Sequence, residues 1–192
     1  MNRTCRILIV LLLTTIPPLA AQNAWSVDIR PDAAFPTSDP GDVELSTGFG
    51  FDATVAYRFM PHLGGYAGWS WNHFAADQAI GGQDITFEET GYGLGLRFIH
   101  PIGTSGLSYL VEGGALIHHI EVENDDGDIV ADSDHGLGWQ VGAGLAVPLG
   151  ERLRLMPGIR YRALSRDLDF GPGAESVDLN YLSVGLAVSW MF

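Results

Sequence analysis

Large apolar residues alternate with small or polar ones through much of this chain, and this pattern constrains the fold more than any other feature. In the C-terminal segment an apolar side chain stands at every second position from Leu182 to Phe192. A period of two places such residues on one face of a β-strand and the intervening residues on the other. Glycine inside the periodic segments disfavours helix. The pattern therefore predicts an all-β chain.

Eight segments with this character predict eight strands, at residues 24–35, 46–59, 64–75, 85–98, 107–121, 135–148, 153–166 and 177–192. Each is long enough to cross a membrane as a tilted strand of about 9–11 residues. The connections alternate between short turns and longer, acidic stretches at 36–45, 76–84, 122–134 and 167–176. Short turns at one end and long loops at the other are typical of an up-and-down barrel in an outer membrane.

The composition of the two strand faces separates a membrane barrel from a soluble, lipocalin-like barrel. A soluble barrel would carry a charged outer face, whereas the second face here is mostly Gly, Ser, Thr and Ala and suits a narrow, crowded interior. We therefore predict an eight-stranded antiparallel up-and-down transmembrane β-barrel. The apolar face also supplies aromatic residues for interfacial girdles: Trp25, Trp69, Tyr92, Phe98, Trp139, Tyr161, Trp190 and Phe192.

The N-terminus has the layout of a secretory signal peptide. Arg3 and Arg6 precede a short apolar run, and small residues follow up to Ala21. We expect residues 1–21 to be removed and residues 22–192 to form one outer membrane barrel domain. Cys5 is the sole cysteine, so the mature domain would hold no disulfide. With 23 acidic residues against ten arginines in the whole chain, nucleic acid is a poor partner.

The closing segment, from Tyr181 through Leu182, Ser183, Val184 and onward to Phe192, resembles the last strand of the OmpA/OmpX-like outer membrane β-barrel proteins. Strand number and loop layout extend the resemblance over the mature chain. It implies residence in the bacterial outer membrane, contact with its lipid, and assembly by the barrel-assembly machinery. In that family the machinery reads an alternating last strand that ends in Phe, which here implies an assembly signal at Leu186, Val188, Trp190 and Phe192.

Charged residues on the second face predict a network inside the barrel. An interior just wide enough for side chains favours a structural salt-bridge plug over a selective filter. Arginine's planar fork suits several carboxylates in a tight space, and Arg30 and Asp52 are expected to face each other across the first hairpin. The predicted lumen charge network comprises Arg30, Asp52, Arg58, Arg97, Glu112, Arg154, Arg160 and Arg162.

The most acidic loop offers weak candidates for a cation site. Asn124, Asp126 and Asp128 have part of the spacing of an EF-hand, but Val122 and Ser133 stand where its first and last ligands belong. A solvent-exposed hairpin tip that turns at Asp126-Gly127 is the favoured interpretation. We therefore predict no metal site and no cofactor.

The histidines do not support an enzyme. A lipid A deacylase of similar architecture uses a His-x-Ser pair on one strand face, and no histidine of this chain has Ser two positions on. His118 and His119 are adjacent, so they point to opposite faces of a strand. The sequence thus predicts a non-enzymatic barrel with a structural or surface-interaction role, acidic extracellular loops and an unknown extracellular ligand. A small-solute channel and a lipid A-modifying enzyme are the alternatives.

Overall fold

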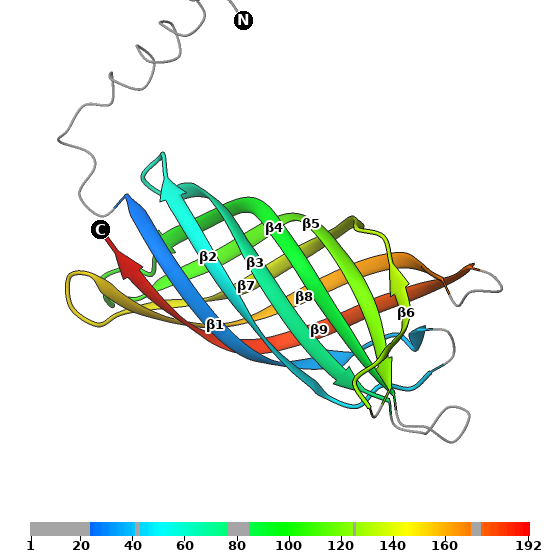
Figure 1. Ribbon diagram of the computed structural model, residues 1–192. Coiled ribbons are helices and arrows are strands. Elements are labelled where there is room, and N and C mark those ends of the chain that lie inside the picture. Colours follow the sequence, from blue (N-terminus) through cyan, green and yellow to red (C-terminus); the bar gives the residue numbers. More distant parts are fainter. Residues whose placement is uncertain (1–23, 41–42, 77–84, 125, 170–173) are drawn as a thin grey trace, which may run out of the picture.

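A computed structural model describes residues 24–40, 43–76, 85–124, 126–169 and 174–192. The predicted signal peptide lies outside these residues. The described chain forms one antiparallel sheet that closes on itself as a barrel (Figure 1). The start of the first strand meets the end of the last strand, where the backbones of Trp25 and Phe192 exchange hydrogen bonds of 3.3 and 3.0 Å. Within the described residues, no helix is long and apolar enough to span a membrane.

Nine strands make up the sheet: β1 (Trp25–Pro36), β2 (Gly48–Arg58), β3 (Leu63–Ala75), β4 (Ile85–Pro101), β5 (Ser108–Asn124), β6 (Ile129–Ser133), β7 (Gly136–Pro148), β8 (Leu153–Asp169) and β9 (Ala174–Met191). Neighbours in sequence pair as hairpins, except β6 and β7, which each pair with β5 and β8. β1 pairs with β9 and closes the ring. The connections of β2 to β3, β4 to β5 and β7 to β8 lie at the end where the termini meet, which we call the turn end; the opposite end is the loop end (Figure 1).

The strand β6 is the one addition to the eight predicted strands. It pairs with β5 and β8, the same neighbours that β7 has further along the barrel. Only Asp134 and His135 separate β6 from β7. The two strands therefore lie in line between β5 and β8 and together occupy the place of one strand in the barrel wall. The predicted up-and-down barrel of eight wall positions is therefore confirmed. Two segments predicted as long loops, 122–134 and 167–176, instead mostly prolong the wall at the loop end, because β5, β6, β8 and β9 extend into them. The predicted loop 76–84 lies outside the described residues except for Ala76.

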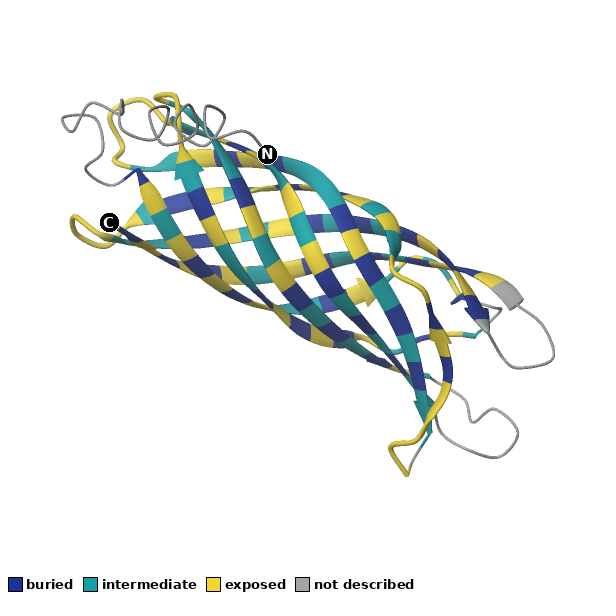
Figure 2. Ribbon diagram, turned by 45° about the horizontal axis from the view of Figure 1, so that its top comes forward, coloured by how far each residue is buried: buried dark blue, intermediate teal, exposed yellow. Residues whose placement is uncertain are grey.

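Burial alternates along the strands as the sequence pattern predicts, and Figure 2 shows this as exposed bands between buried or intermediate ones. In β9 the side chains of Val184, Leu186 and Val188 are exposed, whereas Ser183 and Ala187, which alternate with them, are buried. Aromatic residues pair on the outer face, for example Trp25 with Tyr57 near the turn end and Phe51 with Trp69 further along the barrel. An outer surface this apolar suits lipid.

The interior departs from the expected polar lumen. Its loop end is an apolar core, in which Phe74 and Tyr181 pack edge to face with ring centroids 5.1 Å apart. The buried members of this core are Ala34, Leu45, Phe74, Phe87, Leu116, Ile120, Val122, Ala131, Leu164, Leu168, Val177, Leu179 and Tyr181. The prediction of a largely small and polar second face was thus wrong at this end. At the loop end the strands extend beyond the apolar part of the outer face. In this extension they bury apolar side chains in the interior, as a soluble barrel does.

Candidate functional site

The centre of the barrel interior is built around the buried carboxylate of Asp52. Its Oδ2 accepts a 2.6 Å hydrogen bond from Nη1 of Arg160, and its Oδ1 accepts one from Arg162. Arg30, its register partner across the β1–β2 hairpin, places Nη1 3.5 Å from Oδ2. Arg30 also donates to Asp32 Oδ2 at 2.5 Å. A single carboxylate therefore joins three guanidinium groups from two strands, β1 and β8.

A second branch of this network runs toward the turn end through Glu112. Both Nε and Nη2 of Arg160 donate to Glu112 Oε1, at 3.0 and 2.6 Å. The other oxygen, Oε2, accepts from Arg97 Nε at 3.1 Å, and Arg97 also donates to Asp28. Fork-shaped arginine donors thus link carboxylates from β5, β1 and β2 across the lumen.

A third branch runs toward the apolar core and centres on Glu89. Its Oε2 accepts from Asn72 Nδ2 at 2.8 Å and from the Tyr181 hydroxyl at 2.5 Å, while Oε1 contacts His118 Nδ1. Arg162 connects this branch to Asp52, because its Nη1 donates to the Tyr181 hydroxyl at 3.0 Å. Its Nε donates to Gln140 Oε1 at 3.1 Å.

Ser70, His118 and Glu89 form an arrangement that resembles a hydrolase triad. His118 lies between the other two, with Nε2 3.5 Å from Ser70 Oγ and Nδ1 on the carboxylate. All three side chains are buried, and Ser70 Oγ also accepts a 3.1 Å hydrogen bond from Arg162. The cavity beside Ser70 holds about 10 Å³, roughly one water. An acyl substrate has no room there, so this trio acts as part of the packed interior.

The charges of the described interior balance. Five buried arginines (Arg30, Arg97, Arg160, Arg162 and Arg166) share it with five buried carboxylates (Asp28, Asp32, Asp52, Glu89 and Glu112). Buried charges persist only when they are paired and hydrogen-bonded. Arg166 meets this need through backbone carbonyls, with Nε 2.8 Å from the oxygen of His118.

Two residues of the predicted charge network lie elsewhere. Arg58 is exposed and Arg154 half-buried, and both line a cavity of about 180 Å³ at the turn end. The structure brings the other six together: Arg30, Asp52, Arg97, Glu112, Arg160 and Arg162. The turn-end cavity also reaches Arg97, but it stops there among the described residues, where the ion pairs begin.

Uncharged partners of the network were missed at the sequence level. Tyr66 passes over Gly95 and Gly114, where a Cβ on either glycine would lie 2.6 Å from its hydroxyl. That hydroxyl accepts a 2.9 Å hydrogen bond from Gln140 Nε2. For Tyr181 a signal existed, because continuing the alternation of Ser183 and Gly185 by one step places it inside. For Tyr66 none existed, because neighbouring glycines obscure the faces of β3 and β4.

The acidic hairpin tip turns as predicted. Oδ1 of Asn124 accepts hydrogen bonds from the backbone N–H groups of Asp126 and Asp128, at 3.1 and 2.9 Å. Gly127 adopts φ +79°, a left-handed conformation that glycine takes without strain. The side chain of Asn124 is therefore engaged in shaping the turn. A cation at Asn124, Asp126 and Asp128 stays an untested possibility of the sequence.

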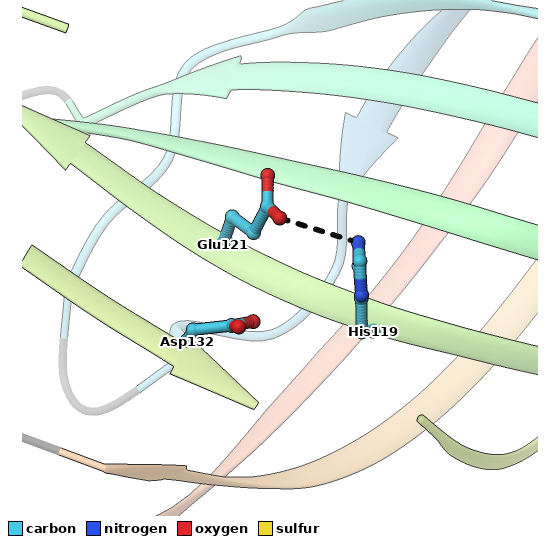
Figure 3. A group of neighbouring side chains, drawn as sticks. All are labelled: His119, Glu121 and Asp132. Carbon is cyan, nitrogen blue, oxygen red and sulfur yellow. Dashed lines mark ion pairs between the residues drawn. The ribbon is translucent and has the colours of Figure 1, made fainter. Parts of the chain in front are cut away.

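A different group of side chains could hold a metal ion. His119, Glu121 and Asp132 lie on the outer face of β5 and β6 at the loop end, with their ligand atoms within 4.8 Å of one another (Figure 3). His119 points away from the lumen and His118 into it, as the alternation predicts. The sequence analysis missed this group because it placed Asp132 in a loop. In the β5–β6 hairpin Asp132 is the register partner of Glu121.

Comparison with known proteins identifies the family. A family model for the outer membrane protein β-barrel domain matches residues 7–192. The structure of Neisserial surface protein A is similar, with a TM-score of 0.67 and 14% identity over 88% of this chain and 97% of that chain. Outer membrane protein OprG from Pseudomonas aeruginosa gives a TM-score of 0.55 and 13% identity over 88% of this chain and 98% of that chain.

At these identities the two structures show the shared fold alone. No curated protein sequence matches the chain. The family match covers nearly all of the sequence, and it agrees with the closed sheet and its apolar outer face. The protein resides in the bacterial outer membrane, and the chain belongs to the outer membrane protein β-barrel domain family.

Proposed function

We propose that this protein is a non-enzymatic, non-conducting outer membrane barrel that acts through the acidic surface at its loop end. The observation that carries the proposal is the filled interior. Ion pairs cross the lumen at its centre, and an apolar core follows toward the loop end. Because such an interior leaves no room for transport, the barrel would serve to hold the loop-end surface in the membrane, where it can bind a ligand. The buried Ser70–His118–Glu89 trio supports no catalysis, since no substrate fits beside it.

The small cavities argue against the small-solute channel. Along the described centre of the barrel, the two cavities beside the network hold about 10 and 20 Å³. A cavity needs roughly 10–15 Å³ to hold one water molecule. The 180 Å³ cavity opens at the turn end and is bounded by Arg97. A solute would have to displace buried ion pairs to pass, and removing a buried partner costs several kcal/mol.

Conductance measurement tests the closed interior. Purified mature protein inserted into planar lipid bilayers should give no steady single-channel current, because ion pairs fill the described centre of the lumen. A 16-stranded porin in the same membranes shows that insertion and detection work, since barrels of that size leave an aqueous channel. Reproducible open levels from this protein would contradict the proposal and favour the channel.

The charge distribution supports a surface role for the loop end. Described carboxylates at this end include Glu44, Glu121, Glu123, Asp126 and Asp128. The described arginines lie in the interior or at the turn end, so they do not neutralise this surface. A concentrated negative field attracts cationic partners and metal ions. This surface therefore fits a ligand of positive charge.

The proposal requires the loop end to face the outside of the cell. An epitope inserted between Asp126 and Gly127, at the exposed β5–β6 tip, should be labelled by antibody on intact cells. Long extracellular loops and short periplasmic turns are the rule for such barrels. The same epitope after Gly150, in the β7–β8 turn, is the control and should be labelled only after the outer membrane is opened. The reverse labelling would invert the orientation.

A further inference from the structure

The outer face of the barrel carries a row of like charges at the loop end. His73 of β3, Glu88 of β4, Glu121 of β5 and Asp132 of β6 are successive register partners on four neighbouring strands. Like charges directly opposite each other in a sheet are destabilising. Three adjacent carboxylates in one row therefore call for a cation.

Within this row Glu88 has protein hydrogen-bond donors, whereas Glu121 and Asp132 have few. Glu88 contacts His73 Nδ1 at 3.2 Å and accepts a 2.9 Å hydrogen bond from Trp71 Nε1. Among the described residues, Glu121 and Asp132 form no ion pair with an arginine. Their neighbouring base is His119, whose Nε2 lies 3.5 Å from Glu121 Oε1.

The Nε2 atom of the His119 imidazole lacks a hydrogen-bond partner within the described structure. This nitrogen is buried and is directed at the Glu121 carboxylate (Figure 3). A buried nitrogen without a partner is costly. Two ligands of one tetrahedral zinc ion, each about 2.0–2.2 Å from the metal, stand about 3.4 Å apart. The observed 3.5 Å is therefore a good spacing for two ligands of a shared ion.

We propose that His119, Glu121 and Asp132 bind a divalent transition-metal ion of the zinc class. One imidazole nitrogen and two carboxylates form a ligand set that zinc accepts, whereas calcium and magnesium prefer oxygen alone. His135 stands beside His119, with ring centroids 4.4 Å apart, but the group of converging ligand atoms is His119, Glu121 and Asp132. The wholly acidic neighbour group of Glu88, Glu121 and Glu123 lacks a nitrogen donor.

The site lies outside the hydrocarbon layer. With strands tilted as in such barrels, each residue rises roughly 2.5 Å along the barrel axis. His119 is eleven positions beyond Ser108, the start of β5, and so stands about 28 Å above the turn end, past an apolar band of about 25 Å. An ion there is reached from the aqueous side and joins β5 to the end of β6. The site thus lies on the same acidic surface that we propose as the functional one.

Calorimetric titration of the folded mature barrel tests the site. The protein in detergent micelles, freed of metal with a chelator, should bind one zinc ion per barrel. His119→Gln and Asp132→Asn should each weaken zinc binding by at least about tenfold, the loss that even outer-shell changes cause. His73→Gln, on the same face but outside the ligand set, should leave the affinity unchanged.

Asp132→Asn guards against misfolding as the cause, because Asp132 is exposed on the short strand β6 and contributes to no barrel core. Circular dichroism of each variant should match that of the wild type. Absence of zinc binding, or zinc binding that His119→Gln leaves intact, overturns the proposal. So does calcium binding that is lost in Glu123→Gln but kept in His119→Gln. None of these outcomes bears on the closed interior, which the conductance measurement tests separately.

Discussion

Replacing Asp52 by alanine should lower the free energy of unfolding by about 3–5 kcal/mol, the usual cost of removing one partner of a buried ion pair. Asp52 is buried and contacts Arg30, Arg160 and Arg162. Without its carboxylate, three guanidinium groups would stand close together with fewer counter-charges. Reversible urea unfolding in lipid vesicles measures the change.

Two variants control for this effect. Asp178→Ala removes an exposed carboxylate from β9 and should change stability by no more than about 0.5 kcal/mol. Asp52→Asn keeps an acceptor oxygen and the shape of the side chain, so it should cost less than Asp52→Ala. If Asp52→Ala is as mild as Asp178→Ala, the ion network is not what holds the interior together.

Arginine at Leu186 should lower folding stability by about 2–4 kcal/mol, the cost of that side chain on the lipid face at mid-membrane. Leu186 is exposed on the outer face of β9. It lies six positions from Phe192, about 15 Å along the barrel axis at the rise expected for tilted strands. That height is close to the middle of the apolar band. The same vesicle unfolding experiment measures the loss.

Ile102→Arg is the matched control, because Ile102 is an exposed aliphatic residue in the β4–β5 turn. Near the interface the same charge should cost about 0–1 kcal/mol. Leu186→Ala removes volume without adding charge. Equal tolerance of arginine at both positions would show that the outer face of β9 does not meet lipid. The assembly signal proposed at Leu186, Val188, Trp190 and Phe192 needs a separate measurement of insertion in cells.

Gln140 shows how the structure changes an expectation about the interior. Its inward position follows from the alternation of 137–147 and is confirmed by its burial. From the sequence we expect Gln140→Arg to be tolerated if carboxylates surround this position and can pair with the new guanidinium. In the structure Gln140 instead joins Arg162 to Tyr66, so Gln140→Arg would add a guanidinium beside an existing one. The strand face is a property of the local sequence, but the neighbours across the lumen are not.

The same division applies to the metal site that we propose. The alternation of His119 and Glu121 on one face of β5 is visible in the sequence. Their third partner, Asp132, depends on whether the chain after the Asp126-Gly127 turn returns as a strand and in which register. The register of β6 also contains a shift between Val122 and Glu123. Such a shift moves a partner by one residue, which reverses the face it occupies.

The amino-acid sequence by itself determined the strand faces, the positions of the three turns at the turn end, the hairpin pair of Arg30 and Asp52, and the family-like closing strand. These are local properties, because a period of two and a tight turn involve residues close together in the chain. Only the tertiary structure decided that Arg97 reaches Asp28 and that Arg160 and Arg162 reach Asp52, with up to 110 positions between them. Those contacts exist because closing the ring through β1 and β9 places side chains from distant strands across one narrow lumen. The apolar core at the loop end likewise follows from closure, since strands that outrun the lipid layer have only one another's inner faces against which to bury Phe74, Leu168 and Tyr181.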